Sequence, residues 1–422
     1  MADVLIVGGG IAGSTLAILL GRQGFTVEIF EQGRFPKEKP CGEGLMPAGV
    51  AVLRRAGLAE AVGGVPFYGV RYHTNDFTVQ GSFPRTHGVA TAGRGQRRRY
   101  LDEVLFRTAR DTRGVTAHTG TRVDQLLREH GRVVGAVVAG KPRRADLVVA
   151  ADGIHSRTRH LLRLDTPLQR KRFGVLTHFQ LARGQKQPPW VDVFLAPGYE
   201  LYVTPLPDGE VLVAGLADAG ALTQPIAKTF SQWWSSQPLL TARLEGARQV
   251  SSIQCIAPLA GKAKCGVAPG IILLGDAAEF IDPITGGGMT HALVTAELLA
   301  HRILLATTNP DDWIWDFERE RRTMLRDYRL LTHALLWLAS HPRFADKMFS
   351  LLSYSPALLS HFVGVAGGVR PLFGALGHNR PLSRGPNLAA AGSCLPDEHS
   401  RGVALNPEVS KPSTLQSTWR KA

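Results

Sequence analysis

The sequence predicts an α/β protein (α+β overall), with a Rossmann-like domain, an inserted antiparallel sheet and C-terminal helices. The first 31 residues alternate between apolar segments, a glycine-rich turn and a helical pattern. Two later apolar segments, 146–151 and 271–274, each lead into a glycine and an acidic residue. Residues 70–83 and several segments between 172 and 217 alternate with period 2, as strands do when one face is buried. At roughly 150 residues per domain, a chain of 422 residues suggests two or three domains.

The N-terminal segment has the order strand, turn, helix, strand. Ala2–Val7 is apolar and rich in β-branched residues, which predicts a strand, and Ser14–Arg22 has the apolar spacing of a helix. Phe25–Phe30 predicts a second strand, which ends at Glu31. This is the context in which a glycine-rich turn binds a dinucleotide.

The turn itself, Gly8-Gly9-Gly10-Ile11-Ala12-Gly13, is a GxGxxG motif. Gly8 permits the tight turn, Gly10 lets the backbone approach a pyrophosphate, and Gly13 lets the helix pack closely on the strand. The helix directs its free N–H groups at the phosphates, and Glu31 can accept hydrogen bonds from ribose hydroxyls. The motif predicts a dinucleotide site without distinguishing NAD from FAD.

Two further strands end at acidic residues. Asp146–Ala151 leads into Asp152-Gly153, and Ile271–Leu274 leads into Gly275-Asp276. In open α/β sheets this edge of the strands binds ligands. The run from Pro283 through Gly286-Gly287-Gly288-Met289 then opens a helix expected over Thr290–Leu304, whose N–H groups can face a phosphate or a flavin edge.

With these three motifs in order, the sequence resembles the FAD-dependent monooxygenase superfamily with the p-hydroxybenzoate hydroxylase fold. The stretch Arg98-x-x-Leu101-Asp102 also matches the family's helix that presents an arginine to FAD. The resemblance covers about residues 1–305 and implies that FAD is the cofactor. The residues it places near FAD are Gly8, Gly10, Ile11, Ala12, Gly13, Glu31, Gln32, Cys41, Gly42, Arg98, Val123, Asp152, Gly153, Gly275, Asp276, Pro283, Gly286, Gly287, Gly288 and Met289. No second GxGxxG follows a strand, so we expect NAD(P)H to act as a transient reductant.

Within that superfamily, residues 35–45 are the most discriminating stretch. They resemble the P-x-x-K-x-x-C-G signature of the geranylgeranyl reductase branch, in which the cysteine faces the substrate pocket. Cys41 is therefore our candidate catalytic residue, as a proton donor or a redox-active thiol. It could equally be a small packing residue beside a glycine turn.

The resemblance implies an FAD-dependent oxidoreductase that acts on an apolar small molecule. We expect an NAD(P)H-using monooxygenase, a hydroxylase or epoxidase of an aromatic, polyketide or isoprenoid compound, because monooxygenases dominate the wider fold. The close alternative is a geranylgeranyl reductase-like enzyme that reduces carbon–carbon double bonds, and a remote one is a non-catalytic lipid-binding escort protein. His73, His87, His178 and Tyr202 lie in segments that could line the pocket, although each residue type is more often structural.

Composition excludes several other classes. Four cysteines without CxxC or Cys/His spacing favour neither a metal site nor a disulfide framework, and a reducing compartment fits better. The net charge of +14 can attract an anionic partner, but we find no nucleic-acid module and expect no specific nucleic-acid partner. With no signal peptide and no apolar run of about 20 residues, we expect a cytoplasmic protein.

The C-terminal part is predicted to be helical from Asp311, with apolar segments over 330–338, 348–352 and 358–365. These helices either cap the substrate cavity or contact a membrane surface as a peripheral protein does. The expected domains are 1–65, 94–165 and 256–305 for the FAD-binding domain, 66–93 and 166–255 for the substrate domain, 306–376 for the helical cap, and 377–422 for a loosely ordered tail.

Overall fold

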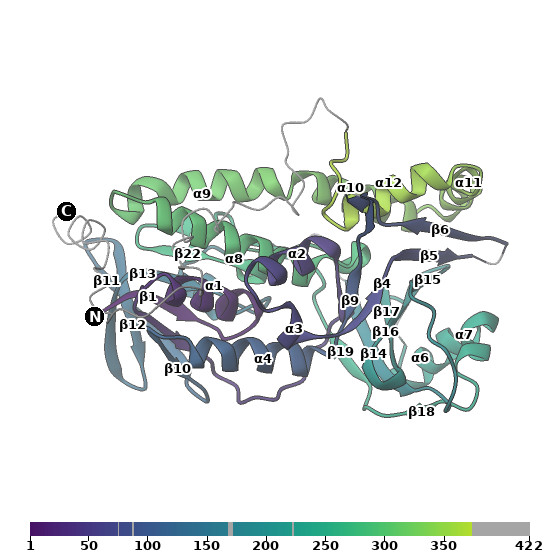
Figure 1. Ribbon diagram of the computed structural model, residues 1–422, viewed down its shortest axis with the longest axis horizontal. Coiled ribbons are helices and arrows are strands. Elements are labelled where there is room, and N and C mark those ends of the chain that lie inside the picture. The colour runs from purple at the N-terminus through teal and green to yellow at the C-terminus, as the bar shows by residue number, and fades with distance from the viewer. Residues whose placement is uncertain (75, 87, 168–171, 222, 374–422) are drawn as a thin grey trace, which may run out of the picture.

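The computed structural model describes residues 1–74, 76–86, 88–167, 172–221 and 223–373. Two large sheets lie side by side, and the C-terminal helices run along one side of both (Figure 1). The predicted α/β class, with an inserted antiparallel sheet, is confirmed. The expected tail, 377–422, lies outside the described residues, as does His87.

The first sheet is parallel at its centre and antiparallel at one side. Its order is β10 (Val115–His118), β2 (Val27–Phe30), β1 (Ala2–Val7), β13 (Lys141–Ala150), β12 (Arg132–Val138), β11 (Val123–Glu129), with β22 (Ile271–Leu273) paired to the end of β13 and β21 (Val267–Ala268) to β22. β10, β2, β1, β13 and β22 pair in parallel. All six residues of β1 are buried, as expected for a parallel strand covered on both faces.

Helices cover one face of this sheet. They are α1 (Ile11–Arg22), α4 (Arg98–Asp111) and α8 (Gly288–Leu305), and α1 contacts both of the others. Side chains of the opposite face, including Leu5 and Val148, pack with residues of β11 and β12. The sheet is therefore held between two apolar cores, and its strand ends are left at the edge that faces the second sheet.

The second sheet matches the predicted antiparallel insertion. Its order is β18 (Arg248–Gln249), β14 (Arg172–Gln180), β17 (Glu210–Asp218), β16 (Tyr199–Pro205), β15 (Val191–Ala196), β5 (Gly69–His73), β6 (Thr78–Ser82), with β19 (Gln254–Ile256) beside β14. Among the strands that the structure describes in this sheet, only β15 and β5 pair in parallel. The predicted run 70–83 is divided into β5 and β6, because the chain turns between His73 and Thr78. α6 (Ile226–Ser235) packs Phe230 and Trp233 on this sheet.

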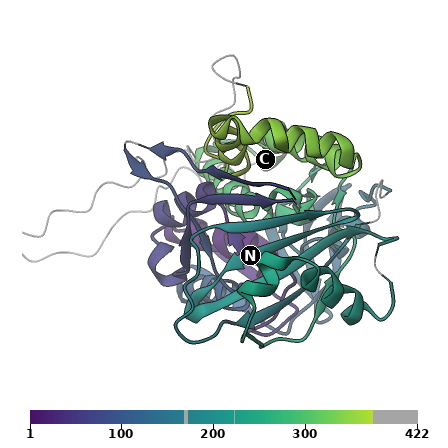
Figure 2. The ribbon, with the colours of Figure 1, turned by 90° about the vertical axis from the view of Figure 1, so that its right-hand side faces the viewer.

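The C-terminal helices are α9 (Pro310–Met324), α10 (Arg326–Ala339), α11 (Pro342–Ser353) and α12 (Pro356–Ala366). α9 packs on α8, whereas α11 and α12 pack on β6. Figure 2, which faces the second sheet, shows these helices lying across its top. Among the described residues no single helix meets the length and hydropathy expected of a membrane span, although 347–353 and 356–366 meet it together across a bend of 110°.

The remaining elements are short. They are β3 (Gly44–Leu45), α2 (Pro47–Arg55), α3 (Ala59–Val62), β4 (Val65–Phe67), β7 (Arg85–Thr86), β8 (Val89–Ala90), β9 (Gly93–Gly95), α5 (Arg157–Leu161), α7 (Pro238–Arg243), β20 (Gly261–Lys262), β23 (Glu279–Phe280) and the 3-10 turns Pro207–Gly209, Gly275–Ala277 and Pro283–Thr285.

Candidate active site

Four parallel strands end level with one another at the edge of the first sheet. Their last residues are paired in register, Phe30 with Val7, Val7 with Ala150, and Ala150 with Leu273. The residues that follow these ends carry the glycine turn, the strand-end glutamate and the two acidic motifs. The structure therefore brings the sequence motifs together along one edge, where ligands bind in open α/β sheets.

The glycine turn leaves space for a ligand at one position only. A Cβ on Gly8, whose φ is +104°, would lie 2.4 Å from the carbonyl oxygen of Ala151, and a Cβ on Gly13 would lie 2.0 Å from that of Gly8. A Cβ on Gly10, by contrast, would meet nothing within 4 Å. Gly10 is also the N-cap of α1, and no described side chain caps this helix end. The free N–H groups and the open space beside Gly10 fit a phosphate.

Glu31 is buried and held rigidly at the end of β2. Its Oε2 accepts a hydrogen bond from the Gly9 N–H at 2.9 Å, and its Oε1 accepts one from the Gly33 N–H at 2.7 Å. The Nζ of Lys37 lies 2.6 Å from Oε1. A carboxylate has about four acceptor sites, so the Glu31 side chain can still receive ribose hydroxyls. Gln32 follows it with an exposed side chain.

The two acidic motifs differ in what their carboxylates contact. Asp152 accepts hydrogen bonds from the Ser156 hydroxyl at 2.5 Å and the Thr158 N–H at 2.9 Å, so its carboxylate is engaged by its own loop. The Asp276 carboxylate receives no hydrogen bond from any described residue, and only the backbone carbonyl of Asp276 accepts one, from Arg159 at 3.5 Å. Burial raises the pKa of the Asp276 carboxyl, and the nearby charge of Lys39 acts in the opposite direction. Asp276 is therefore a partly buried acceptor that is free to bind the hydroxyls of a ligand.

The glycines before α8 are not equivalent. Gly286, Gly288 and Met289 line a cavity beside the strand ends. The N–H of Gly287 instead donates a hydrogen bond to the Tyr328 hydroxyl at 2.7 Å. The helix begins at Gly288, two residues before the expected Thr290. The N–H groups around Gly288 are consequently the ones available at this end of the helix.

Cys41 and Gly42 lie on a loop that also lines this cavity. The Cys41 Sγ accepts a long hydrogen bond from the Glu43 N–H at 3.5 Å. Arg98, the first residue of α4, is buried and paired with Asp102 at 2.9 Å. Burial lowers the pKa of Arg98, but the negative charge and hydrogen bonds of Asp102, together with the contact of the Cys41 side chain, outweigh it and leave that pKa raised. The Cys41 thiol thus lies beside a buried guanidinium.

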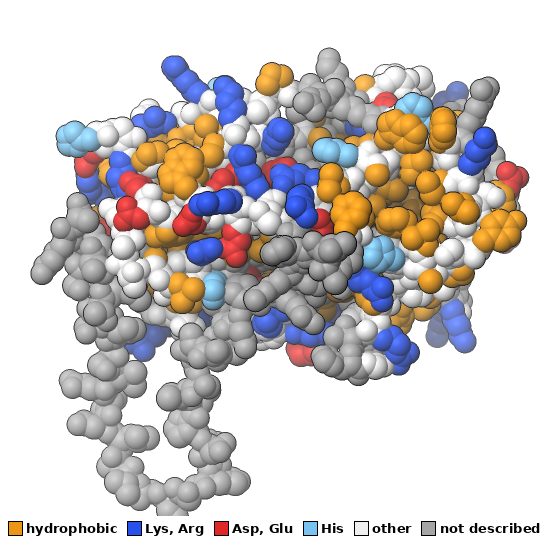
Figure 3. All heavy atoms as spheres, turned by 90° about the horizontal axis from the view of Figure 1, so that it is seen from above, with side chains coloured by type: hydrophobic (Ala, Val, Ile, Leu, Met, Phe, Trp, Pro, Cys, Tyr) orange, Lys and Arg blue, Asp and Glu red, His pale blue; other side chains and the backbone are white. Residues whose placement is uncertain are grey.

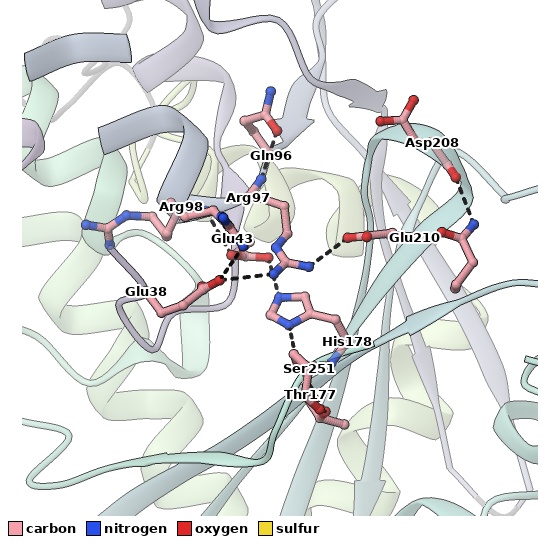
Figure 4. A network of polar contacts seen from close by, with 12 residues as sticks. Glu38, Glu43, Gln96, Arg97, Arg98, Thr177, His178, Asp208, Glu210 and Ser251 are labelled. Carbon is pink, nitrogen blue, oxygen red and sulfur yellow. Dashed lines mark hydrogen bonds and ion pairs between the residues drawn. The ribbon is translucent and has the colours of Figure 1, made fainter. Parts of the chain in front are cut away.

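Glu43 anchors the Cys41 loop to the second sheet, a role that the sequence analysis did not assign (Figure 4). Its Oε1 accepts a hydrogen bond from the Arg98 N–H at 2.8 Å, and its Oε2 lies 2.9 Å from Nε2 of His178. Nδ1 of His178 is 2.8 Å from the Ser251 hydroxyl. Glu43 and His178 are almost fully buried, so this contact fixes the loop in position.

A second connection of the same loop runs through Arg97. Its guanidinium contacts Glu38 on the loop at 3.3 Å and Glu210 on β17 at 2.7 Å (Figure 4). His73, by contrast, is bonded to Asp192 and Thr78 within the second sheet. His73 and His178 are therefore both engaged by other side chains of the fold.

The first cavity is a cleft of about 1180 Å³, part of it open to solvent, between the strand ends and the second sheet. Its charged lining residues, Lys39, Glu43, Arg98 and Asp276, come from the cofactor side. The wall from the second sheet is mainly apolar and is formed by Val175, Leu176, Val191, Val193, Ala214, Leu216 and Ile256, with Thr204 and Tyr202. The start of β11, at Val123, lies in the apolar core with Phe30, away from this lining.

A second cavity lies next to the first, and the two share the lining residues Tyr72, Val193, Tyr202 and Ile284. The Tyr202 hydroxyl donates a hydrogen bond to the carbonyl of Ile284 at 3.0 Å. The Tyr72 hydroxyl has no hydrogen-bond partner among the described residues, and burial raises its pKa to about 12. Tyr72 therefore offers a neutral hydrogen-bond donor where the two cavities meet.

Buried charges form one wall of the second cavity. Arg172 contacts Asp282 at 2.7 Å and Glu200 at 2.6 Å. Burial raises the pKa of Glu200 to about 7, although the charge of Arg172 partly opposes this shift. Because the three partners come from β14, β16 and the turn before α8, they connect the second sheet to the glycine-rich turn.

Comparison with known proteins agrees with this geometry. Residues 1–219 match the FAD binding domain family, and residues 239–331 match the squalene epoxidase family. The first match covers more than half of the chain, so the protein belongs to the FAD binding domain family. The protein is an FAD-dependent oxidoreductase.

Several characterised proteins are similar to the chain. A menaquinone reductase of Mycolicibacterium smegmatis is 26% identical over 87% of this chain and 92% of its own length. A 6-methylpretetramide 4-monooxygenase of Streptomyces rimosus is 30% identical over 72% and 75%, and a digeranylgeranylglycerophospholipid reductase of Methanothrix thermoacetophila is 28% identical over 73% and 79%. The crystal structure of a flavoprotein/dehydrogenase from Cytophaga hutchinsonii superposes with a TM-score of 0.73, at 20% identity over 86% and 92% of the two chains. The predicted resemblance to this superfamily is confirmed.

Proposed function

We propose that the protein is an NAD(P)H-using monooxygenase that inserts one oxygen atom into an apolar aromatic, polyketide or isoprenoid molecule. The observation that carries this proposal is the first cavity, whose charged residues lie on the cofactor side and whose opposite wall is mainly apolar. Oxygen transfer depends on a site from which water is excluded. An apolar wall both excludes water and binds an apolar substrate.

The residues at the strand ends fit FAD. We assign the pyrophosphate to the N-terminus of α1 beside Gly10, the adenosine ribose to Glu31, and the ribityl hydroxyls to Asp276. Gly286, Gly288 and Met289 then lie beside the ring system. FAD supplies the redox chemistry, accepting reducing equivalents from NAD(P)H and activating oxygen. We propose that the other residues that the resemblance places near FAD also lie beside it. The Asp152 carboxylate is the exception in its role, because it holds its own loop and does not bind a hydroxyl of FAD.

The chain itself positions the substrate and excludes water. The Cys41 loop closes one side of the cavity, and the contact between Glu43 and His178 prevents it from moving away. The Tyr72 hydroxyl has no hydrogen-bond partner among the described residues, and we assign it to a polar atom of the substrate. With no second dinucleotide motif in the sequence, NAD(P)H would bind only while it reduces the flavin.

Double-bond reduction is the second candidate, and Cys41 is the observation that favours it. Hydride transfer to a double bond requires a proton donor next to the substrate. The Cys41 thiol lines the cavity beside Arg98, which is where such a donor would be needed. Relatives that are named as reductases of menaquinone and of a digeranylgeranyl lipid also support this candidate.

Turnover with and without oxygen separates the two reactions. The holoprotein would be incubated with NADPH and, in turn, squalene, a menaquinone and an aromatic polyketide, and the products would be analysed by mass. We expect a product that gains one oxygen atom, and only when oxygen is present. A product that gains two hydrogens without oxygen would assign the protein to the reductases. A purified chain that rejects FAD would support the escort alternative.

A further inference from the structure

Large apolar side chains are exposed on the C-terminal helices, and we define them together as the α10–α12 face. Its members are Leu330, Trp337, Phe344, Met348, Leu351, Tyr354, Leu358 and Phe373. Seen from above, hydrophobic side chains gather over this half of the molecule (Figure 3). Single apolar residues are normal on a protein surface, whereas exposed apolar residues grouped on neighbouring helices are typical of a surface that binds a protein, a ligand or a membrane.

Helix α11 is apolar on its buried side and also on part of its exposed side. Phe349 and Leu352 are buried against the second sheet, in the same cluster as Val79 of β6. Phe344, Met348 and Leu351 lie one turn apart along the outer side and are exposed. Because the inner residues already provide the packing of this helix, the fold does not require the outer ones to be apolar.

An aromatic group connects α10 to α11 at the surface. Trp337 stacks on His341 with ring centroids 4.4 Å apart, and it also contacts Phe344 at 5.5 Å. Half of the Trp337 surface is nevertheless exposed, at 50%. Tryptophan and tyrosine are the residues that favour the interface between lipid headgroups and hydrocarbon, and Tyr354 is also exposed on this face.

The exposed charged side chains that the structure describes between residues 326 and 373 are basic. They are Arg326, Lys347 and Arg370. Asp327, an acidic residue of the same region, is buried. An apolar helical face bordered by basic residues is complementary to a membrane surface that contains anionic lipids.

We propose that the α10–α12 face binds the surface of an anionic lipid bilayer. The second cavity lies directly beneath these helices, because Leu335, Leu338 and Ala339 of α10 and Ala345 and Phe349 of α11 line it. Docking would therefore place the bilayer one helix layer away from a cavity that adjoins the candidate active site. The surface proposal does not depend on which reaction the enzyme performs, and its test requires no turnover.

The test is cosedimentation of the full-length holoprotein with vesicles of phosphatidylcholine, with and without phosphatidylglycerol. We expect binding to the anionic vesicles that weakens as salt is added. The double variant Trp337→Ser/Leu351→Ser should raise the lipid concentration needed for half binding by roughly tenfold or more. Its matched control is Trp315→Ser/Leu239→Ser, which changes the same residue types outside the α10–α12 face. Trp315 and Leu239 are 51% and 59% exposed, and Trp337 and Leu351 are 50% and 59% exposed. The control should bind as the wild type does.

Two further measurements keep the test decisive. Lys347→Glu changes charge only, and it should weaken binding to anionic vesicles. Light scattering after size exclusion shows whether the face instead joins two copies of the chain. Failure of the wild type to bind vesicles, equal binding by both double variants, or a dimer that only Trp337→Ser/Leu351→Ser dissociates would each overturn the proposal.

Discussion

Replacement of Gly10 by valine should abolish FAD binding while leaving the fold intact. Gly10 has φ −77° and ψ −168°, an extended conformation that valine adopts readily. Apart from Gly10 itself and its neighbours in the chain, no atom lies within 4 Å of the position of the new Cβ, so the side chain enters empty space. Valine is a weaker N-cap than glycine, and we expect the free energy of unfolding to fall by about 1 kcal/mol or less.

The effect on FAD follows from the contacts that the new side chain would block. If two hydrogen bonds from the start of α1 to the pyrophosphate are lost, at roughly 1.5–3 kcal/mol each, the binding free energy falls by about 3–6 kcal/mol. That corresponds to an increase in Kd of roughly 10²- to 10⁴-fold. The assay is titration of the apoprotein with FAD, followed by flavin fluorescence, together with thermal unfolding of each apoprotein.

Gly220→Val is the matched control, since a Cβ there also meets nothing within 4 Å and Gly220 is exposed beyond β17. This control should bind FAD normally. A folded Gly10→Val protein with the wild-type Kd would refute the placement of the pyrophosphate.

Four other substitutions test separate parts of the account. Asp276→Asn should raise the Kd for FAD by roughly tenfold, because it removes a charge-assisted acceptor of ribityl hydroxyls, and an unchanged titration would mean that this carboxylate faces elsewhere. Gly13→Ala should prevent stable folding, because its Cβ would lie 2.0 Å from the Gly8 carbonyl oxygen; a normal thermal transition would contradict the helix–strand geometry. Cys41→Ser should leave oxygen insertion nearly unchanged but slow a reduction at least roughly tenfold, as product analysis would show. Burial raises the pKa of Glu200 to about 7 in the folded protein. Its contribution to the free energy of unfolding should therefore decrease as the pH rises from about 4.5 to 7, by at most about 3 kcal/mol. Glu200→Gln should make the free energy of unfolding, measured in denaturant, depend less on pH over this range, and an unchanged pH dependence would count against the burial of this carboxyl.

The parts of the site that the sequence predicts are those built from neighbouring residues. The turn from Gly8 to Gly13 needs only a strand and a helix on either side, and the requirement for small residues is visible in the motif itself. The same holds for Gly275 and Asp276, which directly follow a short buried strand. Parallel pairing then brings these motifs to one edge, because strands that share a direction present their carboxyl ends together.

The parts that the sequence does not predict depend on contacts between distant residues. Glu43 meets His178, which lies 135 positions away, and no local pattern indicates that pair. The N–H of Gly287 is taken by Tyr328 from α10, so one glycine of a continuous run differs from its neighbours. Asp152 carries the expected motif, yet its carboxylate is occupied by Ser156. A motif fixes the path of the backbone, whereas the partners of its side chains depend on the packing of the whole fold.

The most direct test of the central assignment is an experimental structure of the protein with FAD bound. The account predicts an extended cofactor, with the pyrophosphate at the start of α1, the ribityl chain at Asp276, and the ring system between Met289 and the Cys41 loop, facing the first cavity. A flavin ring that lies outside this cavity, or a pyrophosphate remote from Gly10, would contradict it.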